Sequence, residues 1–417
     1  MKDIWRQRYQ SLNVQPLNKT VLVGFNANID VKHDLDDKSL DLDETEPENL
    51  EEVSSSSEFK SLLAYCMDKG LNKEVSYEGF EPEVEEDRRE IGGQAGIMAN
   101  FLDRNNAQTL FYTPFLSEEL SKQLSNSLEV PNYSNGDIEY RSPSDSVNTD
   151  RTKINRIFEF EDGKTGRLIL SDRLRGFGPY FRQGIEENLD EIDEKIDRAL
   201  LSGFHNAEGN VEAKLAKASE QLEKMNSPIH MEYVDLSSKL GLLQKYIFPH
   251  IESIGLDEHE MKKLEEGLDL SLDGEKPSLG EAFQFAKFFI EKFDLSRVHI
   301  HTYSYHLNVT ENDYEVGPEK IRESMLYGET CAIKMADEGE IPECGSTLEF
   351  DNKHLRRLDE IEDFADFMGL EEFAETGIAE VEEFKVVAVP PVIHEDPERL
   401  VGMGDLISAG SFVREID

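Results

Sequence analysis

The sequence predicts an α/β protein, in which a large sheet of mostly parallel strands is layered with helices and a smaller β-rich unit is attached. Two observations support this prediction. Short β-branched runs that are apolar throughout recur along the chain, as in parallel strands buried on both faces. Charged helical patterns separate several of these runs, and such alternation favours right-handed strand–helix–strand units.

The expected strands of the large sheet are Thr20–Phe25, Ala199–Gly203, Ile229–Val234, His250–Gly255, Arg297–Tyr303 and Lys385–Val389. The clearest helical patterns between them are Asn210–Met225 and Leu279–Phe293, while Leu256–Glu275 has the pattern of an acidic helix followed by a loop. Ligands of such sheets usually bind beyond the carboxyl ends of the strands. The residues that follow these strands are therefore the candidates for function.

Two regions interrupt the alternation of strands and helices. Val31–Glu90 is dense in Asp, Glu and Ser, which is typical of a surface insertion. Thr152–Phe160 alternates in polarity, a turn at Asp162-Gly163-Lys164 follows, and Leu168–Leu170 then predicts the second strand of a β-hairpin outside the parallel sheet. We expect the two regions to form a lid that excludes water from a group transfer. The expected boundaries are 1–28, 91–135 and 178–417 for the large domain and 29–90 and 136–177 for the lid.

The composition is strongly acidic. The 417 residues include 88 Asp and Glu against 44 Lys and Arg, a formal net charge of −44 at pH 7. A chain this acidic is not expected to bind nucleic acid through a general phosphate-neutralising surface. We interpret the charge as an adaptation to a salty cytoplasm, where ionic strength screens self-repulsion, with an ordinary acidic cytosolic protein as the alternative. An anionic substrate would then need a local basic pocket.

The remaining composition predicts a cytoplasmic protein. Apolar residues make up 38% of the chain, enough to fill a core. Cys66, Cys331 and Cys344 are widely spaced, and we expect neither a disulfide framework nor a metal-ligand pattern from them. No apolar run approaches the roughly 20 residues of a membrane span, and the first residues lack the apolar region of a signal peptide. We expect a monomer or small homo-oligomer that binds neither membranes nor nucleic acid.

The most informative stretch is Gly402-Met403-Gly404-Asp405, followed by a small, apolar run that can open a helix. Glycines let backbone N–H groups approach a ligand, and a helix N-terminus presents unpaired N–H groups with a partial positive charge. An aspartate there can accept a proton from a hydroxyl while the N–H groups hold negative charge. This apparatus suits phosphoryl transfer to an alcohol, although the motif alone is often a simple turn.

Four further segments follow predicted strands or open a helix. Their motifs are Asn28-Ile29-Asp30, Gly92-Gly93-Gln94-Ala95-Gly96, His230-Met231-Glu232 and Asp257-Glu258-His259-Glu260. The amide and carboxylate of the first suit sugar hydroxyls, and carboxylates in the last two can hold Mg²⁺ directly or through its water. Each has an ordinary explanation by itself: a strand-end turn, tight helix packing, or a solvated acidic loop.

Taken in order, these segments resemble the ADP-dependent sugar kinases, the ADP-dependent phosphofructokinase and glucokinase family of the ribokinase-like fold. The resemblance covers about Val21 to Phe412. It is carried by the five segments above together with Tyr112–Leu116, Thr152–Phe160, Leu201–Phe204 and Ser253–Leu256. It implies a three-layer α/β/α large domain with a smaller, discontinuous, β-rich lid.

The resemblance also implies roles for individual residues. The catalytic group would comprise Asp405 as base, the backbone of Gly402, Met403 and Gly404 as anion hole, and Arg173 from the lid, with Arg175 as its rival. Sugar contacts would be Asn28, Asp30, Glu74, Gly92, Gly93 and Gln94. The magnesium–phosphate site would use Glu232, Glu260 and Asp257, and the nucleotide would meet Arg173, His230, Val389, His394 and Gly404. The chain departs from the family pattern at Asp257, where Asn is usual, and at Leu400 and Leu406, where Thr is common.

The acceptor sugar is inferred from the lid cations. A phosphosugar needs fixed cations, and Lys153 and Arg156 lie on one predicted lid strand, with Arg173 nearby. Ordinary strand-surface charge is the alternative explanation. We therefore expect an ADP-dependent phosphotransferase that converts MgADP and fructose 6-phosphate to AMP and fructose 1,6-bisphosphate in glycolysis, with glucokinase activity open as a second function. The alternatives are an ADP-dependent glucokinase only, an ATP-dependent ribokinase-like sugar kinase, or a sugar- or nucleotide-binding protein without activity.

Overall fold

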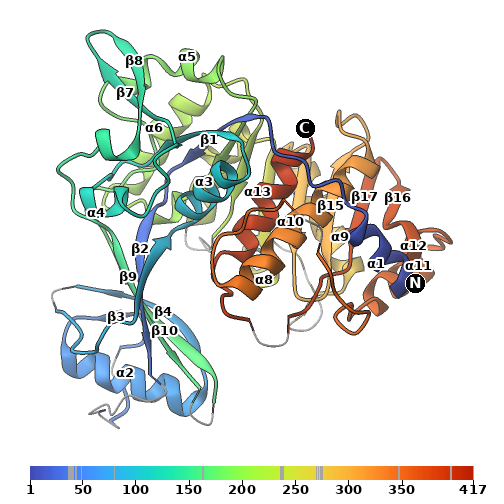
Figure 1. Cartoon of the computed structure of the whole chain (residues 1–417), viewed down its shortest axis with the longest axis horizontal. Coiled ribbons are helices and arrows are strands. Elements are labelled where there is room, and N and C mark those ends of the chain that lie inside the picture. The colour runs from blue at the N-terminus through green and yellow to red at the C-terminus, as the bar shows by residue number, and fades with distance from the viewer. Residues whose placement is uncertain are drawn as a thin grey trace.

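The computed structural model describes residues 1–35, 42, 45–47, 49–78, 80–161, 164–234, 239–268, 270, 272, 276–345, 348–394 and 397–416. They contain a nine-stranded sheet, a six-stranded sheet and a two-stranded sheet. The six-stranded sheet and helix α2 (Ser56–Lys69) form a smaller unit at the bottom of Figure 1, joined to the rest of the molecule by strands that run between them.

The large sheet has the strand order β16-β17-β15-β14-β13-β12-β11-β1-β6. The strands are β1 (Thr20–Gly24), β6 (Gln108–Tyr112), β11 (Arg198–Leu201), β12 (Ile229–Glu232), β13 (Ser253–Asp257), β14 (Arg297–His301), β15 (His306–Glu311), β16 (Ile378–Val381) and β17 (Phe384–Val389). All six expected strands are present. The six strands from β6 to β14 are parallel, but β14–β15, β15–β17 and β17–β16 are antiparallel pairs, so the sheet is mixed.

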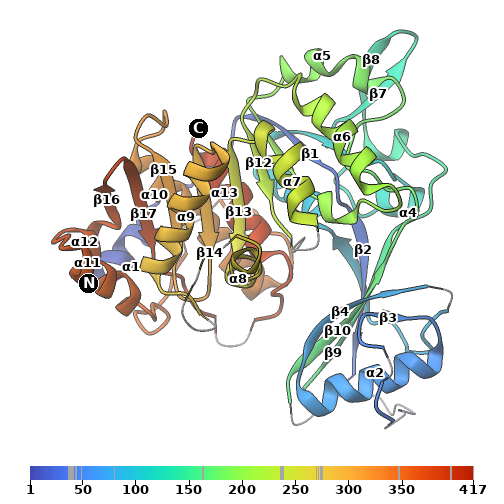
Figure 2. The ribbon, with the colours of Figure 1, turned by 180° about the vertical axis from the view of Figure 1, so that it is seen from behind.

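Helices cover both faces of this sheet, which confirms the three-layer prediction (Figures 1 and 2). One face carries α3 (Gln94–Arg104), α10 (Pro318–Glu338) and α13 (Met403–Arg414), and the other carries α6 (Val211–Leu222), α7 (Leu240–Tyr246), α8 (Glu258–Glu266) and α9 (Leu279–Phe293). Strand β1 shows why: Leu22 packs in the core on the α9 side, whereas Val21 and Val23 pack in the core on the α13 side. Alternate residues of a strand face opposite ways, so a strand apolar throughout needs both layers.

Five further helices lie mainly at the periphery of the part of the molecule that the structure describes (Figure 1). They are α1 (Lys2–Gln10), α4 (Glu118–Ser121), α5 (Leu189–Asp193), α11 (Asp359–Met368) and α12 (Phe373–Thr376). None of the described helices is long and apolar enough to cross a membrane.

The smaller sheet is assembled from two separate chain segments. Its order is β3-β4-β10-β9-β2-β5, formed by β2 (Asn28–Asp34), β3 (Glu52–Val53), β4 (Asn72–Tyr77), β5 (Arg88–Gly92), β9 (Ile154–Phe160) and β10 (Gly166–Asp172). Helix α2 covers it with its own apolar core, in which Phe59 and Leu62 meet Phe158. The predicted hairpin is confirmed, because β9 and β10 pair antiparallel; Asp162 and Gly163 of its predicted turn lie outside the described residues.

The second part of the lid was expected to begin at residue 136, but the structure places residues 130–141 outside the smaller sheet. Strands β7 (Val130–Ser134) and β8 (Asp137–Arg141) pair only with each other, at the top of Figure 1 and far from the smaller sheet. Asn135 and Gly136 both have positive φ angles, 55° and 105°, which is the geometry of a tight hairpin turn. The Asn-Gly pair was the sequence signal, and the chain enters the smaller sheet again only near β9.

The expectation for the cysteines requires correction. Cys331 of α10 and Cys344 form a disulfide with a sequence separation of 13, while Cys66 is a buried free thiol. The two bonded cysteines are both buried, in the core that α10 shares with α3 and α13. Sequence spacing could not reveal the pair, because the residues become neighbours only when the chain beyond α10 folds back against it.

Candidate active site

The candidate residues meet at one edge of the large sheet. Glu232 ends β12, Asp257 ends β13, and the chain leaving β1 reaches Asn28 after four residues. Because parallel strands end at the same edge, these positions lie side by side. Helix α13 begins at Met403 and contacts both β12 and β14, which brings Asp405 to the same edge.

The start of α13 provides backbone donors. Gly402 caps the helix with φ 93°, a left-handed conformation that favours glycine. The first bond of the helix runs from the Leu406 N–H to the Gly402 carbonyl at 3.1 Å, so helix geometry leaves the N–H groups of Gly404 and Asp405 without an intrahelical acceptor. The Met403 N–H already donates to the Leu400 carbonyl at 3.3 Å. Of the three residues expected to form the anion hole, Met403 is thus the weakest candidate.

Asp405 lies in a crowded acidic environment. Burial raises the pKa of its carboxyl well above the usual range, and the charges of Glu232 and Asp30 raise it further. The positive charge of Arg399 acts in the opposite direction. A carboxylate with a raised pKa is suited to accept a proton, because a general base works best when its pKa approaches the working pH.

Arg399 and Glu90 are site residues that the sequence reasoning missed. The Arg399 side chain is 3% exposed; its Nε donates to the Val401 carbonyl at 3.0 Å, and Nη1 lies 3.3 Å from Glu90 Oε2. Glu90 belongs to β5 of the smaller sheet and also pairs with Lys32 at 3.1 Å. The Arg399–Glu90 pair therefore joins the loop before Asp405 to the smaller unit. The sequence held one signal for Arg399: it is a basic residue three positions before Gly402, in a chain that is poor in basic residues.

Two of the three expected metal ligands, Asp257 and Glu260, also cap helix α8. Asp257 Oδ1 accepts the N–H groups of His259 at 2.9 Å and Glu260 at 2.8 Å, and Glu260 Oε2 accepts the Asp257 N–H at 2.9 Å. Burial and the charges of Asp257 and Glu232 raise the pKa of Glu260 well above its usual range. Burial also raises the pKa of Glu232, to about 7. Such mutual repulsion is what a divalent cation relieves.

The expected sugar contacts are adjacent. Asn28 and Asp30 lie on β2, which pairs with β5 so that Asn28 is opposite Gly92. The Asn28 Nδ2 donates to Asp30 Oδ1 at 2.6 Å, and both side chains are buried. Gln94 opens α3 directly after Gly93, and its Oε1 is buried without a hydrogen-bond partner. A buried acceptor of this kind can receive a hydrogen bond from a polar ligand.

Asp30→Asn is expected to stabilise the fold at about pH 7.5 by up to ~3 kcal/mol. Burial raises the pKa of Asp30 to about 6, with the Asn28 hydrogen bond opposing it. The folded state therefore holds this proton more tightly than the unfolded chain, and the stability it contributes is lost as pH rises from about 4 to about 6. Urea unfolding of both proteins across this range should show a larger fall in the wild type, because Glu232, Glu260 and Asp405 also have raised pKa values and contribute a fall in both proteins. An Asp30→Asn protein equally destabilised at every pH would contradict this.

A cavity of about 1470 Å³ lies between the smaller sheet and the loops at the edge of the large sheet. Glu74, Asp172, Arg173 and Arg175 line it from β4 and the end of β10, while Lys239 lines it from the other side. Arg173 Nη2 is 4.0 Å from Glu74, whereas Arg175 is 86% exposed and pairs with Glu78 at 2.9 Å. Arg173 is therefore the better placed of the two rival arginines. Asp405 is not among the residues that line this cavity.

The expectation that Lys153 and Arg156 form one cation cluster requires correction. They are three residues apart along an extended segment, so their side chains face opposite sides. Arg156 pairs with Glu81, while Lys153 Nζ donates to Asn206 Oδ1 at 3.0 Å and to Asn26 Oδ1 at 3.3 Å. Lys153 is 5% exposed and forms no ion pair with any described residue. Burial lowers its pKa to about 8.

Three of the residues expected to contact the nucleotide have other contacts in this structure. His230 is completely buried and its ring bonds to Glu232 and Ser253, so it lies behind the carboxylate and not at an open surface. Val389 is completely buried in the core at the end of β17. His394 Nε2 lies 3.1 Å from Asp337 Oδ1 on α10. A direct nucleotide contact by Val389 or His394 stays a prediction.

Comparison with known proteins identifies a family. Residues 19–414 match the ADP-specific phosphofructokinase/glucokinase conserved region. The chain is 24% identical to an ADP-specific phosphofructokinase of Pyrococcus horikoshii, over 96% of this chain and 98% of that protein. It is 26% identical to an ADP-dependent glucose/glucosamine kinase of Pyrococcus furiosus, over 99% of this chain and 98% of that protein.

The same relationship appears in three dimensions. A solved ADP-dependent kinase in complex with fructose 6-phosphate and ADPβS superposes with a TM-score of 0.85, at 25% sequence identity, covering 100% of this chain and 97% of that one. A reconstructed last common ancestor of ADP-dependent phosphofructokinases from Methanosarcinales superposes with a TM-score of 0.80, at 25% identity, covering 99% and 96% of the two chains.

Proposed function

Because the chain belongs to the ADP-specific phosphofructokinase/glucokinase family, we propose that it transfers the β-phosphoryl group of ADP to the 1-hydroxyl of fructose 6-phosphate. The observation that favours this acceptor is Lys153, a buried cation whose contacts are two neutral amides. The carboxylates of Glu74, Asp30 and Asp172 act on this charge from a distance, but no described carboxylate forms an ion pair with it. A sugar phosphate would supply an anion in direct contact with the buried ammonium group. The products are AMP and fructose 1,6-bisphosphate, as expected for a glycolytic step.

Asp405 is the proposed base. It accepts the proton of the sugar 1-hydroxyl as that oxygen forms its bond to the β-phosphorus. The bond between the β-phosphorus and the bridging oxygen breaks, and this oxygen leaves with AMP. Little covalent chemistry is asked of the protein in phosphoryl transfer, so alignment and charge stabilisation supply most of the acceleration. The raised pKa of Asp405 suits it to this task.

The transferred group is negatively charged and needs donors around it. The N–H groups of Gly404 and Asp405 point out of the first turn of α13, where the helix dipole adds positive potential. Arg173 extends from the smaller sheet, and its ion pair with Glu74 among the described residues is long, at 4.0 Å, so its charge is available to stabilise a phosphate when the lid closes. Asn28 and Asp30 would hold the sugar hydroxyls.

The carboxylates fit a magnesium ion carried by the nucleotide. Among the described residues no group of three or more His, Cys, Asp or Glu side chains is arranged to hold a metal by itself. This agrees with Mg²⁺, which usually keeps several waters and takes one or two carboxylates together with substrate phosphates. Glu232, Glu260 and Asp257 are the residues that would hold it. When bound, it would neutralise charge on the phosphates of ADP.

Glucose is the second candidate acceptor. The similarity to the ADP-dependent glucose/glucosamine kinase extends over nearly the whole chain, as does the similarity to the phosphofructokinases. The pair Asn28 and Asp30 contacts hydroxyls that both sugars have, so it does not discriminate between them. Lys153 does discriminate between the two sugars, because glucose has no phosphate group that could form an ion pair with it.

The surroundings of the enzyme are inferred from its charge. With a net charge of −44, the folded chain repels itself strongly in dilute buffer. We propose that it works in a cytoplasm of high ionic strength, where screening within about 10 Å or less weakens this repulsion. We propose a monomer or small homo-oligomer whose partners are its small-molecule substrates.

Product analysis tests the proposed function. With MgADP and fructose 6-phosphate, phosphorus NMR should show AMP and a sugar with two phosphates appearing in equal amounts. Omitting the sugar should leave ADP intact, because the lid is expected to exclude water from the transfer. Formation of inorganic phosphate in place of the sugar bisphosphate, or no change in ADP, would contradict the proposal.

A further inference from the structure

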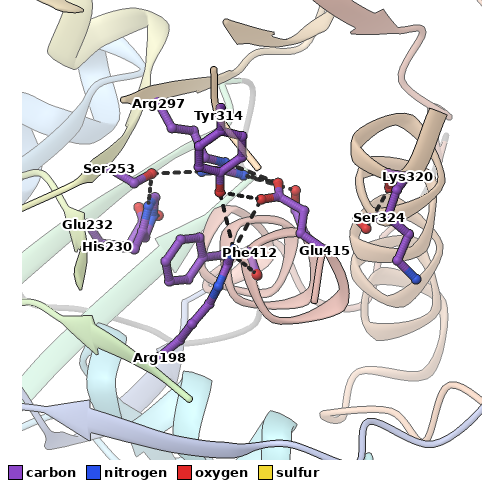
Figure 3. A network of polar contacts seen from close by, with 11 residues as sticks. Arg198, His230, Glu232, Ser253, Arg297, Tyr314, Lys320, Ser324, Phe412 and Glu415 are labelled. Atoms are coloured by element: carbon purple, nitrogen blue, oxygen red, sulfur yellow. Dashed lines mark hydrogen bonds and ion pairs between the residues drawn. The ribbon is translucent and has the colours of Figure 1, made fainter. Parts of the chain in front are cut away.

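A chain of buried polar side chains runs from the end of α13 to Glu232 (Figure 3). Glu415 caps the carboxyl end of α13, and its Oε1 accepts hydrogen bonds from Arg297 Nε at 3.0 Å and Nη2 at 2.9 Å. Arg297 Nη1 donates to Ser253 Oγ at 2.9 Å, Ser253 Oγ lies 2.8 Å from His230 Nδ1, and His230 Nε2 lies 2.8 Å from Glu232 Oε1. All five side chains are at least nine-tenths buried.

The donors and acceptors in these side chains fix the direction in which each hydrogen bond is donated. An arginine side chain has donors but no acceptor, so the Ser253 oxygen must accept from Arg297. The Ser253 hydroxyl hydrogen is then available to His230 Nδ1, which accepts it with a lone pair. The other ring nitrogen, Nε2, lies 2.8 Å from Glu232 Oε1, and because a carboxylate oxygen only accepts, Nε2 carries the ring proton and donates it to Glu232. Every bond from Arg297 onward points toward Glu232.

A glycine makes room for the last of these bonds. Gly255 lies on β13 beside Glu232, and a Cβ at this position would be 2.2 Å from Glu232 Oε1 and 2.8 Å from His230 Nε2. A side chain here would displace the bonded pair. Glycine weakens a strand interior and often marks a place where another group approaches closely. The backbone of β13 is thus fitted to the His230–Glu232 contact independently of the hydrogen-bond chain.

We propose that Ser253, Arg297 and Glu415 are positioning residues that fix the tautomer of His230 and thereby hold Glu232 toward the magnesium–phosphate site. This proposal rests on the proposed function in one respect, the role of Glu232. The groups that orient a ligand carboxylate or imidazole commonly decide how well the ligand works. The chain of hydrogen bonds also connects Glu232 to the carboxyl end of α13, and Asp405 lies near the opposite end of this helix. One helix therefore holds the proposed base at its start and sets the orientation of a proposed metal ligand from its end.

Ser253→Ala is the sharpest variant, because it removes only the hydroxyl that links Arg297 to His230. Ser253→Thr keeps a hydroxyl and should restore the link. Ser324→Ala is the matched control: Ser324 is equally buried, but its hydroxyl donates to the Lys320 carbonyl within α10 and does not contact His230 (Figure 3). Thermal unfolding of all three proteins shows whether each remains folded.

The first readout is the His230 tautomer in the protein without ligands, by nitrogen NMR of the protein with labelled histidine and with His230→Gln for assignment. The wild type and Ser253→Thr should carry the proton on Nε2, whereas Ser253→Ala should show exchange between both tautomers. The second readout is calorimetric titration of Mg²⁺ in the presence of ADP, for which Ser253→Ala should require about fivefold more Mg²⁺ for half-saturation.

A Ser253→Ala protein that keeps the Nε2 tautomer would overturn the proposal, as would a Ser324→Ala protein that changes both readouts equally. The tautomer is read without substrate, so it does not depend on turnover. If the protein proved inactive with every sugar but the tautomer shifted as expected, the proposed function would fail and the positioning role would stand.

Discussion

Asp405→Asn should lower kcat for phosphoryl transfer to fructose 6-phosphate by about 10³-fold, within the 10²- to 10⁴-fold range typical of a positioned general base. Asparagine has the shape of aspartate but cannot accept the proton of the attacking hydroxyl. The change also removes a negative charge next to Glu232 and Asp30, whose repulsion raises the pKa of Asp405. The variant should therefore be at least as stable as the wild type and should bind ADP with similar affinity.

The control for this variant is Glu281→Gln. Glu281 is the third residue of α9, after Leu279 and Gly280, as Asp405 is the third residue of α13, after Met403 and Gly404. Both changes remove an acid from the first turn of a helix, but Glu281 belongs to the capping box of α9 and not to the site. Steady-state rates, calorimetric ADP binding and thermal unfolding separate the outcomes. A near-wild-type rate for Asp405→Asn would refute the assignment of the base.

Lys153→Met should reduce kcat/KM for fructose 6-phosphate at least about 100-fold, because loss of one partner of a buried charge pair typically costs several kcal/mol. The loss should appear mainly in KM, since Lys153 is proposed to bind the phosphate of the sugar and not the reacting group. Methionine retains the length of the side chain and removes a buried charge, but it also removes the hydrogen bonds to Asn206 and Asn26, so thermal unfolding of the variant is measured together with its rates. ADP affinity should stay within about threefold, because no role in ADP binding is assigned to Lys153.

Arg156→Met is the matched control: Arg156 lies on β9, and Lys153 directly precedes this strand. The Arg156 side chain is 10% exposed, but it pairs with Glu81, so its charge already has a partner within the protein. Its kcat/KM for fructose 6-phosphate should change by less than about threefold. Equal losses of kcat/KM for both variants would support the original expectation that Lys153 and Arg156 together bind the phosphate of the sugar, against the alternation of side chains along the strand. An unchanged Lys153→Met enzyme would remove the main argument for a phosphosugar acceptor.

The parts of the fold that follow from local pattern were predictable. Apolar β-branched runs such as Thr20–Gly24 became buried parallel strands, and the amphipathic pattern of Leu279–Phe293 became α9 at the expected bounds. The mixed edge of the sheet was not predicted, because β15 alternates His306, Asn308 and Thr310 with apolar residues and lacks a continuous apolar run. The Cys331–Cys344 pair depends on a tertiary approach that spacing does not encode.

The candidate site was predicted where a motif combines a backbone conformation with a charged side chain. Gly402 with Asp405 and Asn28 with Asp30 are such cases, and the structure brings Asp30 and Asp405 close enough for their charges to interact. Arg399, Glu90 and Arg297 were not predicted because each lies far in sequence from a group that it contacts. Ser253 lay in a segment that carried the resemblance, but its contact with His230 was not predicted for the same reason. Lys153 and Arg156 were grouped by proximity along the chain, and the two-residue period of a strand separates them.

The most direct test of the account is a set of initial rates for the wild-type protein in high KCl, with MgADP or MgATP as donor and fructose 6-phosphate or glucose as acceptor. The account predicts turnover with MgADP and fructose 6-phosphate, much slower turnover with MgATP, and a lower kcat/KM for glucose. Turnover only with glucose would leave Asp405 as base but contradict the role of Lys153. Turnover with MgATP in preference to MgADP would contradict the central claim that ADP is the phosphoryl donor.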